Sequence, residues 1–172
     1  MLEAIKAKIR DIPDFPVPGI VFKDITPLLS DHGTFNAAIG MLSQRYMDHQ
    51  IDYVIGIEAR GFVLGAPLAT ALQAGFVMVR KPGKLPSTTL RATYQLEYGE
   101  DTLEIHKDAM MPGSRVLLVD DVLATGGTMS AAVELVQALH CNVVELVFLI
   151  ELSFLSGRER LQPYNLYALI QY

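Results

Sequence analysis

Two adjacent carboxylates, Asp120 and Asp121, stand shortly before a run of small, hydroxylated and glycine residues, Ala124-Thr125-Gly126-Gly127-Thr128. Glycines let a backbone approach a ligand closely, and the free N–H groups where a helix begins favour an anion such as phosphate. Acid beside such a site is costly, because like charges about 4 Å apart cost on the order of 4 kcal/mol at an effective dielectric of 20. A ligand with hydroxyls beside its phosphate removes this conflict, because the hydroxyls donate to the carboxylates. Ribose 5-phosphate has this chemistry, and the alternative is a buried strand that ends in a capping acid pair and a turn.

A second candidate site is the run Glu58-Ala59-Arg60-Gly61, which also lies between an apolar stretch and an apolar helical pattern. A planar guanidinium beside free helical N–H groups suits a diphosphate. Lys81 and Lys84, further along the chain, carry the charge that would complement the same ligand. The alternative is a surface ion pair between Arg60 and Glu58 at the start of a helix.

Strand and helix patterns alternate along the chain, which is typical of an α/β fold with a mostly parallel twisted sheet flanked by helices. In such a sheet, ligands bind at the carboxyl ends of the strands, where both candidate sites lie. Apolar runs predict strands at residues 20–22, 53–57, 76–79, 103–107, 116–119, 142–152 and 166–172. Apolar residues at helical spacing predict helices at residues 2–10, 34–47 (capped by Asp31 or Thr34) and 62–72, and another directly after Thr128.

Residues 82–102 break this regular pattern and are rich in glycine, proline, serine and threonine. About twenty residues is long for a simple connection in a compact domain, so the segment is predicted to be a flexible lid. Alternating residues over 93–98 also allow an exposed hairpin.

Composition narrows the classes of protein. The chain has 172 residues, 51% of them hydrophobic and 19% charged, which fits one domain with a sizeable core. The net charge of −5 argues against a nucleic-acid partner. The sequence shows neither an apolar run long enough to span a membrane nor a signal peptide, and its single cysteine, Cys141, fits a reducing cytoplasm. The four histidines lack metal-ligand spacing.

Residues 116–128 resemble the phosphoribosyl-pyrophosphate motif of the type I phosphoribosyltransferases. Further matches to this family follow in the expected order at 15–27, 56–62, 80–86 and 96–99. The resemblance implies the family's fold in one domain of residues 1–172, with a base-covering hood at about 1–30, a core at about 31–172 and a lid at about 82–102. It also implies transfer of ribose 5-phosphate from phosphoribosyl pyrophosphate to a purine base, with release of pyrophosphate. The remaining resemblance is to members that act on N9 of adenine and form AMP.

The resemblance also assigns roles to residues. Ribose 5-phosphate is expected at Asp120, Asp121, Ala124, Thr125, Gly126, Gly127 and Thr128, and pyrophosphate at Glu58, Ala59, Arg60, Gly61, Lys81, Lys84 and Tyr98. The base is expected at Val21, Phe22 and Lys23, with Glu97 and Arg60 as catalytic residues. Mg²⁺ is expected to bind mainly through the substrate, with Asp120 or Asp121 contributing through water. A cytoplasmic homodimer is expected, without nucleic-acid or membrane partners.

Two other classes of protein remain as alternatives, together with a transferase for another purine base. A regulator that senses phosphoribosyl pyrophosphate would keep the phosphate loop without turnover, although this short acidic chain shows no added basic or helix-turn-helix segment. An ATP-hydrolysing module would need G-x-x-x-x-G-K-[ST], which the sequence lacks.

Overall fold

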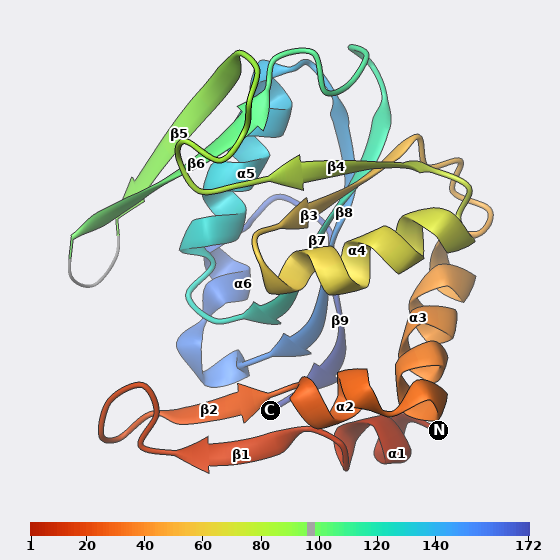
Figure 1. Cartoon of the computed structure of the whole chain (residues 1–172), viewed down its shortest axis with the longest axis vertical. Helices are drawn as coiled ribbons and strands as arrows, with labels where there is room; N and C mark the ends of the chain where they lie inside the picture. The colour runs from red at the N-terminus through yellow and green to blue at the C-terminus, as the bar shows by residue number, and fades with distance from the viewer. Residues whose placement is uncertain (96–98) are drawn as a thin grey trace.

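A computed structural model describes residues 1–95 and 99–172. Its centre is a five-stranded sheet in the order β4-β3-β7-β8-β9, in which every neighbouring pair is parallel. Helices cover both faces of this sheet (Figure 1). The α/β fold with a parallel sheet flanked by helices is therefore confirmed.

The elements have the following bounds. The helices are α1 (Leu2–Lys6), α2 (Thr26–Ser30), α3 (His32–Tyr46), α4 (Arg60–Ala71), α5 (Gly127–Ala138) and α6 (Gly157–Arg160), with a 3₁₀ turn at Ser153–Leu155. The strands are β1 (Arg10–Pro13), β2 (Val21–Asp24), β3 (Tyr53–Ile57), β4 (Gly75–Val79), β5 (Thr89–Gln95), β6 (Glu100–His106), β7 (Arg115–Leu123), β8 (Asn142–Glu151) and β9 (Leu166–Gln171). None of the helices in the described part of the chain is both long and apolar enough to cross a bilayer.

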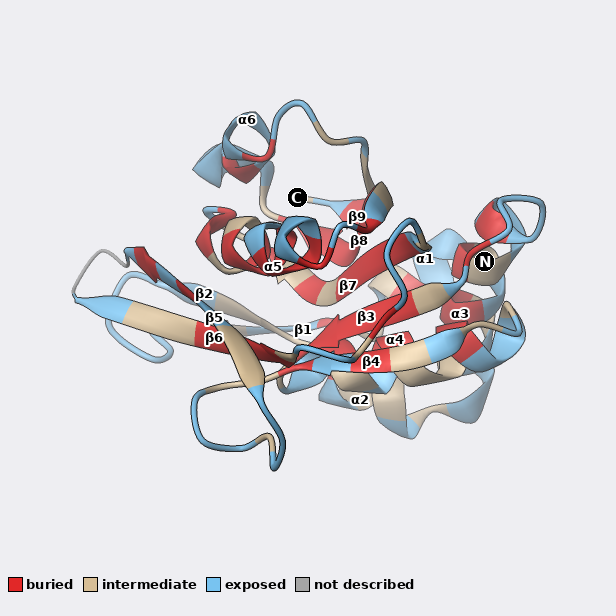
Figure 2. Ribbon diagram, turned by 90° about the horizontal axis from the view of Figure 1, so that it is seen from above, coloured by how far each residue is buried: buried red, intermediate tan, exposed pale blue. Residues whose placement is uncertain are grey.

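Strand β7 is apolar on both sides because it separates two cores. Val116 and Leu118 pack on the face covered by α5, whereas Leu117 and Val119 pack on the face covered by α1, α3 and α4. All four are fully buried. Figure 2 shows the buried residues concentrated in the central strands, between α5 on one side and α3 and α4 on the other. After Arg115 the strand has no polar residue until Asp120 and Asp121, which lie near its carboxyl end as the sequence predicts.

The N-terminal segment departs from the prediction of a helix over residues 2–10. Helix α1 ends at Lys6, and β1 instead pairs antiparallel with β2, which places Ile12 opposite Phe22. Helical spacing of the isoleucines is overridden here by strand pairing. Helix α3 begins at His32, two residues before the predicted start, and Asp31 is its cap, because the Asp31 carboxylate accepts a 2.9 Å hydrogen bond from the Thr34 N–H.

Most of the described part of segment 82–102 is strand rather than irregular loop. β5 and β6 pair antiparallel and project beyond the sheet (Figure 1). The inward-facing residues Ala92, Tyr94, Leu103 and Ile105 are buried in the same core as α5. This burial explains the alternation in the sequence, because one face of the hairpin packs on a helix and the other faces water.

Candidate active site

One cavity of about 350 Å³ lies where β3 and β7 end, between the β1–β2 hairpin and the β5–β6 hairpin. This volume lies within the range typical of small-molecule sites. Segments far apart in sequence line it: Ile20, Val21, Phe22, Lys23, Glu58, Ala59, Arg60, Lys81, Tyr94, Asp120, Asp121, Val122, Ala124, Thr128 and Leu152. The structure therefore brings most of the predicted site residues into one place.

The loop after β7 forms a second, smaller hollow of about 80 Å³, lined by residues 122–129 together with Asp120 and Phe148. Gly126 adopts φ +81°, a conformation that L side chains rarely take, and it immediately precedes α5. A Cβ there would also lie 2.9 Å from the carbonyl oxygen of Gly157. The glycine thus permits both the turn and the close packing of the loop on α6, a requirement that the sequence alone does not reveal.

Asp120 and Asp121 lie side by side, and Arg60 forms an ion pair with Asp121. Arg60 Nε lies 2.8 Å from Asp121 Oδ2, and the same guanidinium lies over the Phe22 ring at 5.0 Å. Burial raises the pKa of Asp120 well above its ordinary value, and the charge of Asp121 raises it further. Burial also raises the pKa of Asp121, although Arg60 opposes that shift. The pair is therefore prepared to accept hydrogen bonds from hydroxyls or to face a cation.

Glu58 gathers the cations that surround the loop after β3. Its carboxylate accepts hydrogen bonds from Lys84 Nζ at 2.8 Å, from the Lys81 N–H at 2.8 Å and from Arg80 at 3.3 Å. Burial raises the pKa of Glu58, but these donors outweigh it and hold the pKa at about 2. Arg60 pairs with Asp121 instead of Glu58, so the alternative of an Arg60–Glu58 surface pair is not what the structure shows.

Gly61, also predicted in this loop, lies in the first turn of α4 and packs against β7. A Cβ at this position would lie 2.6 Å from the Val119 carbonyl oxygen. Its contribution is therefore to bring the helix N-terminus close to the acidic pair.

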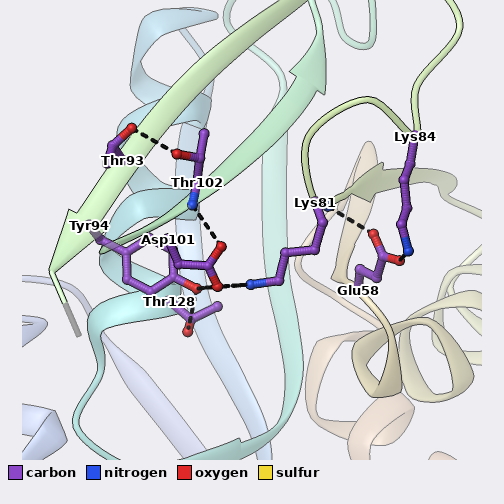
Figure 3. Close-up of polar contacts among 8 residues, drawn as sticks. All are labelled: Glu58, Lys81, Lys84, Thr93, Tyr94, Asp101, Thr102 and Thr128. Carbon is purple, nitrogen blue, oxygen red and sulfur yellow. Dashed lines mark hydrogen bonds and ion pairs between the residues drawn. The ribbon is translucent and has the colours of Figure 1, made fainter. Parts of the chain in front are cut away.

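Lys81 extends toward the β5–β6 hairpin, where its ammonium binds Asp101 and lies 3.3 Å from the Tyr94 hydroxyl (Figure 3). The Tyr94 hydroxyl also accepts a 3.3 Å hydrogen bond from Thr128. Sequence reasoning missed Tyr94, Asp101 and Arg80. Alternation along 93–98 was the signal for Tyr94, whereas nothing in the spacing indicated the partner of Lys81.

The predicted base residues line the apolar end of the cavity. Val21 and Phe22 lie there with Ile20, Val122 and Leu152. Lys23 also lines the cavity, but its ammonium pairs with Asp11 at 2.7 Å and lies 3.8 Å from the centre of the Tyr172 ring.

The predicted residues Glu97 and Tyr98 lie outside the described residues.

The described side chains limit how a metal ion could be bound. Within residues 1–95 and 99–172, no group of three or more histidine, cysteine, aspartate or glutamate side chains could hold a metal ion. Asp120 and Asp121 nevertheless line the cavity together. Mg²⁺ commonly binds through one or two carboxylates plus substrate phosphates, so the pair fits that mode.

Known proteins are similar to this chain in both sequence and fold. The family model for the phosphoribosyl transferase domain matches residues 25–166. An adenine phosphoribosyltransferase of Halothermothrix orenii is 56% identical over 97% of this chain and 98% of its own length. The crystal structure of adenine phosphoribosyltransferase from Thermoanaerobacter pseudethanolicus superposes with a TM-score of 0.97 at 54% identity, covering 100% of both chains. The Saccharomyces cerevisiae enzyme, complexed with an iminoaltritol bisphosphate and adenine, gives a TM-score of 0.93 at 43% identity, covering 98% of this chain and 97% of that one.

Proposed function

The chain belongs to the phosphoribosyl transferase family, and we propose that it transfers ribose 5-phosphate from phosphoribosyl pyrophosphate to N9 of adenine, giving AMP and pyrophosphate. It is a pentosyltransferase. The observation that supports the reaction most strongly is that one cavity is lined by an apolar hood, a cationic loop and an acidic pair, and that the smaller hollow of the phosphate loop shares Asp120, Val122, Ala124 and Thr128 with it. Each part matches one part of the substrates.

The phosphate loop and the acidic pair hold the sugar. Free N–H groups at the start of α5, with Thr125 and Thr128, bind the 5-phosphate. Asp120 and Asp121 accept hydrogen bonds from the ribose hydroxyls, and their negative charge favours the positive charge that develops at the anomeric carbon. The bond from this carbon to the pyrophosphate oxygen breaks as the bond to N9 forms.

Cations beside Glu58 stabilise the leaving group. Arg60, Lys81 and Lys84 lie around the end of β3, where the diphosphate would project from the sugar. In the ligand-free protein, Glu58 and Asp101 neutralise the two lysines, so the diphosphate must compete with internal carboxylates. The acidic pair would help substrate oxygens to hold Mg²⁺, and the ion would supply further neutralisation of the diphosphate.

Adenine binds at the apolar end of the cavity. A planar base suits the Phe22 ring and the branched side chains of Val21, Val122 and Leu152. Exclusion of water at this end limits hydrolysis of the donor. Glu97, carried between β5 and β6, is proposed to accept the proton that leaves the base.

The experiment measures AMP and pyrophosphate after mixing the protein with Mg²⁺, phosphoribosyl pyrophosphate and one base at a time. Stoichiometric AMP and pyrophosphate with adenine, and at least 100-fold lower kcat/KM with hypoxanthine or guanine, are expected. Binding of phosphoribosyl pyrophosphate without product would indicate a regulator, and preference for another base would assign a different purine specificity.

We also propose that the enzyme is a cytoplasmic homodimer that serves purine salvage. The resemblance to the family supports self-association. Light scattering coupled to size-exclusion chromatography tests this, with a mass twice that of one chain expected.

A further inference from the structure

Lys81 is held at the rim of the cavity by the hairpin opposite it. Lys81 and Tyr94 line the cavity, and Asp101 binds both of them from β6 (Figure 3). The Asp101 carboxylate is itself fixed by a 2.8 Å hydrogen bond from the Thr102 N–H. Burial works to lower the pKa of Lys81, but its bonds to Asp101 and Tyr94 raise it overall. The lysine is thus charged and oriented before any ligand binds.

The cavity contains competing positions for that ammonium. Glu58, Asp120 and Asp121 all line it. Glu58, in the loop after β3, already accepts a hydrogen bond from the backbone N–H of Lys81, so a side chain released from the hairpin would have a carboxylate beside its own backbone. An ammonium that folded onto this carboxylate or the acidic pair would occupy the space of the diphosphate or the ribose.

We propose that Asp101 is a positioning residue for the diphosphate subsite: it holds Lys81 at the rim, facing the ligand, and prevents the ammonium from collapsing onto the carboxylates within the cavity. The proposal rests on the proposed transferase function. It also links the β5–β6 hairpin to the loop after β4, because the same contact joins both. Asp101 acts through Lys81 and does not itself touch the reacting atoms.

The test is the kinetic effect of Asp101→Asn, which removes the charge and keeps an acceptor for the Thr102 N–H. The KM for phosphoribosyl pyrophosphate should rise about fivefold, the scale of one partly exposed ion pair, while kcat and the KM for adenine change less than twofold. Affinity for magnesium pyrophosphate alone, measured by calorimetry, should fall by a similar factor. Glu100→Gln is the control, because it removes the same charge from the adjacent exposed residue. It should change the KM for phosphoribosyl pyrophosphate and the affinity for magnesium pyrophosphate by less than twofold.

A double-mutant comparison separates positioning from general damage to the hairpin. In a Lys81→Gln background, Asp101→Asn should change the KM for phosphoribosyl pyrophosphate by less than twofold, because the group that it positions is gone. Asp101→Glu, which restores the charge, should recover at least half of the lost affinity.

An unchanged or lowered KM in Asp101→Asn would overturn the proposal, and so would an equal effect in both backgrounds. If Asp101→Asn does not fold, Asp101→Ser replaces it in the same comparison, since it removes the charge and keeps an oxygen that can accept from the Thr102 N–H; the same outcomes then apply. Absence of AMP formation by the unaltered protein would instead refute the transferase function, so the two failures are distinguishable.

Discussion

Replacing Asp120 with asparagine should make the ligand-free protein more stable and far less active. The pKa of Asp120 is raised by burial and by Asp121, so neutral pH forces charge onto a crowded pair. Two like charges about 4 Å apart would cost on the order of 4 kcal/mol at an effective dielectric of 20. Arg60, 2.8 Å from Asp121, offsets much of this cost. A net gain of about 1 kcal/mol remains, or roughly 2–4 °C in melting temperature for a domain of this size.

The raised pKa of Asp120 determines how the free energy of unfolding changes with pH. Native Asp120 retains its proton to higher pH than an unfolded aspartate, whose pKa is about 3.9. The native state therefore binds more protons between about pH 4 and the raised pKa, and stability from this group falls as pH rises through that window. The Asp120→Asn variant should show a smaller fall, because its asparagine does not titrate and still accepts the Asp121 N–H, as Asp120 Oδ1 does at 2.9 Å.

Thermal unfolding followed by circular dichroism from pH 4 to pH 8 tests stability, and initial rates of AMP formation test function. The kcat/KM for phosphoribosyl pyrophosphate should fall by about 10- to 100-fold, since a hydrogen bond to a charged group contributes about 1.5–3 kcal/mol. Asp108→Asn, at an exposed position, is the matched control and should leave both measurements unchanged. A variant that melts below the unaltered protein at pH 8, or that keeps full activity, would refute the electrostatic account of the pair.

Three further substitutions test other parts of the site. Gly157→Ala would place a Cβ against the Ala124 carbonyl oxygen, well inside contact distance, and should destabilise the protein by about 1–3 kcal/mol in urea unfolding; unchanged stability would show that the loop yields. Arg60→Lys loses the planar guanidinium beside Asp121 and should lower kcat/KM by about 10-fold or more in initial-rate assays, whereas near-normal kinetics would mean that a point charge suffices. Phe22→Ala should raise the KM for adenine by about 10-fold and leave that for phosphoribosyl pyrophosphate within twofold, and equal effects on both would contradict its assignment to the base.

The sequence contains enough information to predict the sheet and the edge at which ligands gather. The apolar runs at 53–57 and 116–119 lie in adjacent parallel strands, β3 and β7, and their loops therefore meet. The order of strands and loops along the chain places these two loops together, so local sequence patterns are sufficient to predict that they are neighbours. The Asp31 cap of α3 is predictable for the same reason, since its partner is three residues away.

Long-range partners are what the sequence does not reveal. Lys81 is recognisable as a cation, but its partner Asp101 lies across a hairpin whose packing on α5 is needed to bring the two together. Lys23 is similar, because its ammonium binds Asp11 on the paired strand and lies over the Tyr172 ring. The prediction of the N-terminal helix's length is wrong for a related reason, because the pairing of β1 with β2 determines where α1 ends.

The close packing of Gly126 against Gly157 has a consequence for biosynthesis. Gly157 is synthesised about thirty residues after the loop itself. A nascent chain that has emerged from the ribosome only as far as β8 therefore carries every predicted site residue and still lacks the segment on which the phosphate loop packs. A phosphate loop shaped to hold a sugar phosphate is thus expected only after α6 has emerged and packed against it.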